Sequence, residues 1–274
     1  EMCIRDRMKV ENSTVSTTGD SSPAIMIADG GGILIADGGS FTTSGAMSQG
    51  IYSKGDVTVT NASVNALNAK AAVLKGNNTI TLSGTILEGK ETTDAVPYNI
   101  VLFSDEKDIG TMGTQHFDVR GGSLISHKGG MFYVTATHGK ISLNGTAITM
   151  DDPAANLITV AGNDGANGWG TPGRNGGHVE LVADNQILTG NISVDSISNI
   201  NMMLKNNSTF NGIISIVPNA EGGEKYKTNA DVFIAAGSTW NLTGNSTLTS
   251  LYNLGTINYN GYTITLANGT VMKA

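Results

Sequence analysis

Apolar and polar residues alternate over short runs along the whole chain, and the runs recur at a nearly constant interval. In residues 140–149, KISLNGTAIT, Ile141 and Leu143 flank a polar residue, a small polar turn follows, and Ile148 comes next. An alternation with a period of two residues places successive side chains on opposite sides of a β-strand. The pattern therefore predicts short strands separated by turns rich in Gly and Asn.

The alternating run repeats with a period near 24 residues. Its matches begin at Met8, Ile33, Val57, Ile80, Phe117, Ile141, Val179, Met202, Val232 and Ile257. Most intervals are 23 to 25 residues long, and the longer intervals carry insertions. A second apolar segment, such as AVL at 72–74 or MFYV at 131–134, follows within each period. This arrangement is typical of a solenoid in which each coil, meaning one turn of the chain around the rod, stacks on the coil before it.

We therefore expect an all-β fold, a single-domain parallel β-helix of about ten coils with two or three loop insertions. The inward residues of all coils would form one continuous core, to which Trp240 belongs by its place in the repeat. Gly (36 residues) and β-branched residues are too frequent for a helical protein, and a hydrophobic fraction of 39% is too high for a disordered chain.

Charge and hydropathy exclude two classes of partner. The net charge is −7 and no cluster of Lys and Arg is present, whereas a nucleic-acid surface needs a basic stripe. The longest fully apolar run, IVLF at 100–103, is far shorter than the roughly 20 residues that cross a bilayer. We expect neither nucleic-acid binding nor a membrane span.

Residues 1–7, EMCIRDR, fit no repeat and contain the only cysteine. They resemble translated sequencing-adapter DNA at the end of an assembled metagenomic fragment. We therefore expect residues 1–7 to be a non-native leader and residues 8–274 to be the β-helix domain. On this expectation, the native signal peptide is missing from the fragment.

Two passages carry a resemblance to known proteins: GWGTPGRNGGHVELVADNQILTGNI at 168–192 and AGSTWNLTGNSTLTSLYNLGTI at 236–257. They resemble the coils of right-handed parallel β-helix repeat proteins, particularly adhesin-like and autotransporter-passenger-like bacterial surface proteins. The resemblance extends over residues 8–274. It implies a secreted or cell-surface bacterial protein that binds glycans or host and cell-surface proteins. Because the same solenoid also carries lyases and glycosidases, the fold alone does not specify the function.

A polysaccharide lyase or glycoside hydrolase is the alternative function. The repeat assigns the outward column of the first strand in each coil to Leu34, Thr58, Thr81, Asp118, Ser142, Glu180, Met203 and Phe233. Asp118 and Glu180 would lie two strand spacings apart, about 9.6 Å. Inverting glycosidases separate their carboxylates by roughly 6.5–9.5 Å. Arg120 ends the strand of Asp118, so these three residues are the catalytic candidates, although two solvated surface acids explain the pattern as well.

Ligand-binding candidates lie in the insertions, since loops on a rigid scaffold carry function more often than the scaffold does. Trp169 lies among glycines, where its ring can stack on a sugar while Asn167, Arg174 and Asn175 bind hydroxyl groups. The alternative is that Trp169 folds back over the neighbouring coil. Tyr98 belongs to the insertion at 88–99, the most charged region of the chain.

Metal binding is not expected from the sequence. The Gly- and Asn-rich segment 162–177 faintly resembles a calcium repeat, but it occurs once, whereas calcium needs six or more oxygen ligands. His116, His127, His138 and His178 do not follow the spacing of zinc ligands, so we interpret them as surface residues. No cofactor is predicted.

Uncapped ends of the rod would expose strand edges and favour end-to-end association. Besides an adhesin and a carbohydrate-cleaving enzyme, a purely structural spacer domain is the third function that the sequence allows.

Overall fold

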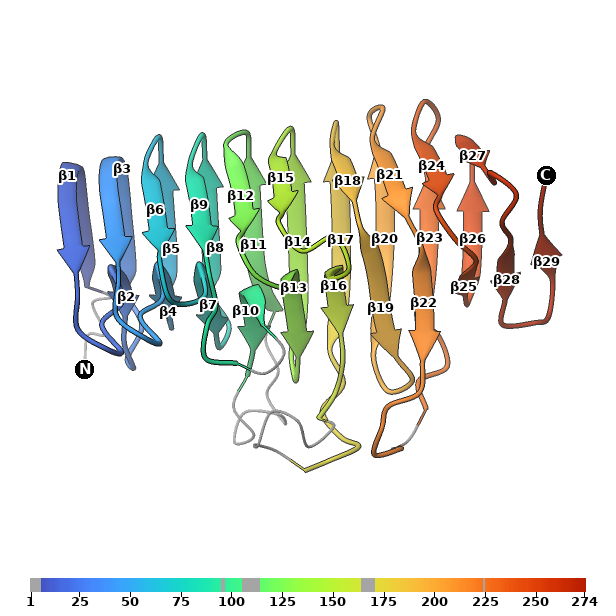
Figure 1. Cartoon of the computed structure of the whole chain (residues 1–274), viewed down its shortest axis with the longest axis horizontal. Coiled ribbons are helices and arrows are strands. Elements are labelled where there is room, and N and C mark those ends of the chain that lie inside the picture. The colour runs from blue at the N-terminus through green and yellow to red at the C-terminus, as the bar shows by residue number, and fades with distance from the viewer. Residues whose placement is uncertain (1–5, 95–96, 105–113, 164–170, 224) are drawn as a thin grey trace.

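The computed structural model describes residues 6–94, 97–104, 114–163, 171–223 and 225–274. In these ranges every regular element is a β-strand, and the strands pair in parallel except at the C-terminal end. The strands follow one another along the long axis of the molecule in chain order (Figure 1). The chain is therefore an all-β parallel solenoid, as its periodicity predicts.

The first face of the solenoid is a row of parallel strands, each paired with the next. The row contains β1 (Arg7–Thr17), β3 (Ile33–Thr43), β5 (Asp56–Thr60), β8 (Thr79–Ser83), β11 (Thr114–Arg120), β14 (His138–Asn144), β17 (His178–Asp184), β20 (Asn199–Lys205), β23 (Ala230–Ile234) and β26 (Ser250–Asn253). Inward and outward residues alternate along each strand, so Phe117 and Val119 are buried while Asp118 between them faces outward.

The second face begins where the C-terminal half of β3 pairs with the next strand. It contains β6 (Ser63–Ala66), β9 (Ile86–Gly89), β12 (Ser123–Ser126), β15 (Ala147–Met150), β18 (Ile187–Thr189), β21 (Thr209–Gly212), β24 (Thr239–Leu242) and β27 (Thr256–Asn258). Among these described strands, β15 and β18 share no ladder, so the second face consists of two separate sheets.

The third face closes each coil. It contains β2 (Ile25–Ile27), β4 (Ile51–Ser53), β7 (Ala72–Lys75), β10 (Tyr98–Phe103), β13 (Gly130–Thr135), β16 (Asn156–Val160), β19 (Asn191–Asp195) and β22 (Ile214–Val217). Beyond it lies a small sheet of β25 (Ser246–Leu248), β28 (Ile264–Leu266) and β29 (Val271–Met272), in which β29 pairs antiparallel with β28. The short apolar segments predicted at 72–74 and 131–134 lie in β7 and β13.

The inward side chains of the three faces form one hydrophobic core. Phe117, Phe132, Phe210 and Trp240 are its largest fully buried residues. The rings of Phe210 and Trp240 lie 5.5 Å apart, and the indole Nε1 donates a hydrogen bond to the carbonyl of Gly212 at 3.0 Å. The predicted core position of Trp240 is confirmed, and the hydrogen bond satisfies its polar group within the core.

The predicted register is correct in the middle of the rod. Val57 pairs with Ile80, Ile80 with Phe117, and Phe117 with Ile141. These residues occupy one inward column, as the repeat requires. The outward neighbours of this column, including Asp118, lie where the repeat assigns them.

Three register assignments are wrong. Leu34 pairs with Val57 and faces inward, with 8% of its side chain exposed, although the repeat assigned it outward. Another wrong assignment concerns the last coil, where Leu251 rather than Ile257 pairs with Val232. Ile257 lies instead on the second face, opposite Trp240.

The remaining wrong assignment concerns β17, which carries the predicted catalytic residue Glu180. Leu181, and not Val179, pairs with Ile141, while Val179 pairs with Gly139. A shift of two residues leaves every inward side chain inward, so the apolar pattern cannot detect it. The shift moves Glu180 into a different outward column from the one predicted.

Candidate functional site

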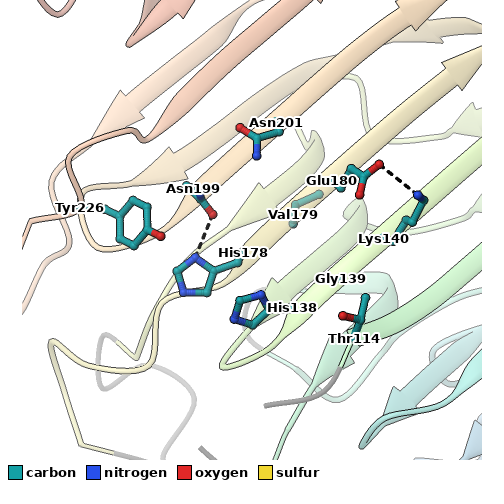
Figure 2. A pocket seen from close by; sticks show the side chains of 10 residues that line it. All are labelled: Thr114, His138, Gly139, Lys140, His178, Val179, Glu180, Asn199, Asn201 and Tyr226. Atoms are coloured by element: carbon teal, nitrogen blue, oxygen red, sulfur yellow. Dashed lines mark hydrogen bonds and ion pairs between the residues drawn. The ribbon is translucent and has the colours of Figure 1, made fainter. Parts of the chain in front are cut away.

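An open pocket of about 230 Å³ lies on the outward side of the first face. Figure 2 shows side chains from β11, β14, β17 and β20 and from the 218–229 segment around it. The lining residues are Thr114, His138, Gly139, Lys140, His178, Val179, Glu180, Asn199, Asn201 and Tyr226. Because successive strands pair in register, residues far apart in the chain become neighbours here.

Three rings form a row along one edge of the pocket. His138 pairs in register with His178, and their rings lie 4.7 Å apart at an angle of 38°. The ring of Tyr226 lies 5.0 Å from that of His178. Burial, and then the neighbouring His178, lower the pKa of His138 below its ordinary value of 6.5. The imidazole of His138 is therefore neutral at pH 7.

The amide of Asn199 fixes the orientation of His178. Nδ1 of His178 lies 2.8 Å from Oδ1 of Asn199 on the next strand (Figure 2). Since an amide oxygen only accepts hydrogen bonds, Nδ1 of His178 is the donor in this contact, and in the neutral ring the lone pair is then on Nε2. Asn201 follows two residues later on the same side of β20 and adds a second amide to the pocket.

An ion pair forms the opposite edge of the pocket. Lys140 Nζ and Glu180 Oε1 lie 3.0 Å apart, and the two residues pair in register across β14 and β17. Both side chains are partly exposed, so the pair adds little to stability. The pairing does neutralise the charges of the lysine and the glutamate that line the pocket.

Hydrogen bonds to Asp195 and Ser196 anchor described residues of the segment that carries Tyr226. The backbone N–H of Tyr226 donates to the carbonyl of Ser196 at 2.8 Å, and that of Asn219 donates to Oγ of Ser196 at 3.0 Å. The buried carboxylate of Asp195 accepts from Nδ2 of Asn219 at 2.7 Å and from the N–H of Gly162 at 2.8 Å. These bonds attach Asn219 and the backbone of Tyr226 to the solenoid.

A strip of apolar and aromatic side chains continues from the pocket toward the C-terminal end of the first face. Met203 pairs in register with Phe233, and Phe233 with Tyr252. The rings of Phe233 and Tyr252 stack 5.5 Å apart at an angle of 11°. We call Met203, Phe233 and Tyr252 the aromatic strip. Tyr252 is 61% exposed and Met203 39% exposed, so the strip faces solvent.

The predicted catalytic residues do not form a common column. Asp118 pairs with Ser142, and Ser142 with Val182, whereas Glu180 pairs with Lys140. Arg120 is exposed at the end of β11. Within the described ranges, no ion pair joins Asp118 to Arg120 or to Glu180. The predicted column with two acids in it is therefore wrong, and Glu180 alone of the three residues lines the pocket.

The predicted ligand-binding residues have different outcomes. Trp169 and Asn167 lie outside the described residues. Arg174 is exposed, and Asn175 adopts a left-handed backbone conformation with φ of 62°; neither lines the pocket. Tyr98 is the first residue of β10 and not part of an insertion. Its ring stacks on Tyr133 at 5.0 Å on the third face.

The sequence prediction missed the residues that do line the pocket. It treated the histidines as separate surface residues, and it did not single out Tyr226 or Asn199. One signal was available: aligning HGKISLN at 138–144 with HVELVAD at 178–184 by their histidines gives the observed register. Across the described ranges, no group of three or more His, Cys, Asp or Glu side chains is arranged to hold a metal ion.

Comparison of the chain with protein-family models, with curated proteins and with solved structures gives no match. In the described ranges, no helix has the length and apolar character needed to span a membrane.

Proposed function

We propose that the protein is an adhesin-like, right-handed parallel β-helix of about ten coils that binds glycans without cleaving them. The binding surface runs along the outward side of the first face, from the pocket to the aromatic strip. We further propose that the protein is secreted or displayed on a bacterial surface, in line with its resemblance to passenger-type proteins. Its insertions and the outward side of its first face would bind glycans or other surface partners.

The observation that carries this proposal is the combination of exposed rings and amides on one continuous surface. Tyr226 is 42% exposed, and Asn199 and Asn201 lie beside it in the pocket. Sugar rings present apolar faces that pack on aromatic rings, and hydroxyl groups that hydrogen-bond to amides. A surface with both features suits a polyhydroxylated ligand better than an apolar ligand.

The geometry of the strip adds to the argument. Asn201 connects the pocket to the strip, because it pairs in register with Asp231 and lies two residues before Met203 on the same side of β20. Asp231 in turn accepts a hydrogen bond from Oγ of Ser250 at 2.5 Å. A column of polar groups therefore runs beside the column of apolar groups. Neighbouring strands are about 4.8 Å apart, so the surface can contact an extended chain over several strands.

Cleavage is the runner-up function. It requires acids gathered in one groove, and among the residues that the structure describes, Glu180 is the only carboxylate that lines the pocket. Glu180 forms an ion pair with Lys140, and Asp118 lies in another column. A spacer function requires no exposed rings beside amides, so the aromatic strip favours binding over a purely structural role.

The test is a panel of plant, host and microbial polysaccharides, with binding and released reducing or unsaturated ends measured together. We expect binding without release of ends. Tyr226→Ala and Tyr252→Ala should each weaken binding by about tenfold, which corresponds to about 1.4 kcal/mol, because each removes an exposed ring from the surface. Tyr262→Ala is the matched control, since Tyr262 is 39% exposed but lies outside the pocket and the strip.

Two results would contradict the proposal. One is release of ends that disappears in Asp118→Asn or Glu180→Gln, which would establish a carbohydrate-cleaving enzyme. The other is a complete absence of binding across the panel, or binding that Tyr226→Ala and Tyr252→Ala both leave unchanged. That result would favour a spacer or a surface that recognises proteins.

A further inference from the structure

His138 and His178 occupy equivalent outward positions on neighbouring strands of the first face. β14 and β17 pair from these two residues onward, and the rings lie 4.7 Å apart. In a parallel ladder, side chains at paired positions lie side by side and project in the same direction. Both imidazoles line the pocket (Figure 2); His138 is exposed and His178 is half-buried. A small ion can therefore approach both rings at once.

The hydrogen bond to Asn199 prepares His178 for such a role. With the proton held on Nδ1 by Oδ1 of Asn199 at 2.8 Å, Nε2 presents its lone pair. Metal-binding histidines in proteins usually donate their second ring nitrogen to an oxygen atom, which fixes the tautomer and the orientation of the ring. Asn199 supplies this oxygen from the strand that follows.

The lysine that lines the pocket carries a paired charge. Nζ of Lys140 lies 3.0 Å from Oε1 of Glu180. In the part of the chain that the structure describes, the pocket offers two imidazole nitrogens and few carboxylate oxygens. Calcium and magnesium prefer oxygen ligands, whereas copper, nickel and zinc bind imidazole well. Water molecules would complete the coordination.

We propose that His138 and His178 form a binding site for one divalent transition-metal ion, with Cu²⁺ bound more tightly than Ni²⁺ or Zn²⁺. Asn199 acts as a positioning residue for His178. The site requires no glycan, and it would exist whether or not the first face binds one. It also differs from the calcium site considered for residues 162–177, because its ligands are nitrogens on two strands.

The test uses the full chain without a polyhistidine tag. Cu²⁺, Ni²⁺, Zn²⁺ and Ca²⁺ are titrated by calorimetry at pH 7, and the Cu²⁺ complex is examined by electron paramagnetic resonance. We expect one Cu²⁺ per chain with nitrogen hyperfine structure, and no binding of Ca²⁺. His138→Gln and His178→Gln should each lower the Cu²⁺ affinity by at least about tenfold and remove one nitrogen from the spectrum.

Two further variants separate the site from alternatives. Asn199→Ala should lower the affinity by about tenfold without changing the number of nitrogens, whereas Asn199→Asp, which keeps the acceptor, should restore it. His127→Gln is the control, because His127 lies beyond the second face and contacts Glu88 and Asp151. Absence of stoichiometric Cu²⁺ binding would overturn the proposal, as would binding that survives both pocket substitutions but is lost in His127→Gln.

Discussion

In several coils, the residue directly after the first-face strand adopts a left-handed backbone conformation. Asn61, Asn185 and Asn206 have φ values of 51°, 49° and 52°, and Gly84 and Gly121 have φ values of 57° and 60°. Asparagine and glycine tolerate this conformation better than other residues do. The recurrent Asn and Gly of the sequence therefore turn the chain from the first face to the second, which explains much of the composition without ligand chemistry.

Glu91 is a residue whose charge is stabilised in a buried place. Its side chain is 3% exposed, its Oε2 lies 2.7 Å from Nζ of Lys70, and its Oε1 accepts from N and Oγ1 of Thr93 at 2.6 and 2.5 Å. Burial by itself would raise the pKa of Glu91. The bonds from Lys70 and Thr93 outweigh that effect and hold the pKa below its ordinary value of 4.5.

The depressed pKa of Glu91 predicts loss of stability in acid. Because the folded state binds the proton less readily than the unfolded state, the contribution of Glu91 is fully present above pH 4.5 and is lost as the pH falls through the lower, folded pKa. In Glu91→Gln, the decrease in unfolding free energy between about pH 5 and pH 3 should be shallower than in the parent chain. Urea unfolding at several pH values measures this slope. Glu221→Gln, an exposed position, is the control; equal slopes for Glu91→Gln and the parent chain would contradict the assignment.

At the scale of the element, the alternation of apolar residues was enough to predict strands, faces and the core. Phe117, Val119 and Trp240 could be placed inward from the sequence, because burial of one side of a strand leaves a signal of period two. The register of β17 could not be placed in this way. A slip of two residues preserves that signal, and the structure shows Leu181 opposite Ile141 instead of Val179.

The gap between β15 and β18 is bridged by a side chain. Oε1 of Gln186 accepts from the backbone N–H of Thr146 at 2.8 Å, and Nε2 donates to the carbonyl of the same residue at 2.7 Å. The amide of Gln186 thus takes the place of a paired peptide group where these two described strands form no ladder. Ile148 and Met150 of β15 are only half-buried beside this gap, unlike Leu124 on the preceding strand.

Removing the Gln186 amide should destabilise the fold. Gln186→Ala leaves the buried N–H and C=O of Thr146 without their partner, which we expect to lower the unfolding free energy by about 1–3 kcal/mol. Gln186→Glu should also destabilise, since an ionised carboxylate can accept from the N–H but cannot donate to the carbonyl. Urea unfolding gives both values.

Gln49→Ala is the matched control for this prediction, because Gln49 is half-buried but bridges no such gap. A loss of stability in Gln186→Ala no larger than that in Gln49→Ala would show that the bridge contributes nothing.

At the scale of the whole molecule, the pocket is assembled from segments that lie far apart in the sequence. Thr114, His138, His178, Asn199 and Tyr226 come from four strands and one insertion. The period of the repeat brings such residues to one face, but only the exact register decides which of them touch. The sequence therefore predicted the rod, whereas the set of side chains that lines the pocket depended on a register that the apolar pattern leaves open.

The pairing of the terminal strands determines what the two ends of the rod can contact. β1 pairs with β3 through one edge, and at the C-terminal end β29 turns back to pair antiparallel with β28 (Figure 1). An unpaired strand edge is a template for pairing with another strand. End-to-end association through these edges remains a prediction.

The central claim is that ligand binds along the pocket and the aromatic strip. Hydroxyl-radical footprinting with mass spectrometry tests this claim most directly, because it reports the exposure of individual Met and Tyr side chains. The protein would be compared free and saturated with the tightest-binding polysaccharide of the panel. We predict that oxidation of Met203, Tyr226 and Tyr252 falls on binding, while that of Met26 and Met47, each 52% exposed elsewhere on the rod, does not change. Protection of Met26 or Met47 with no protection of the other three residues would contradict the account.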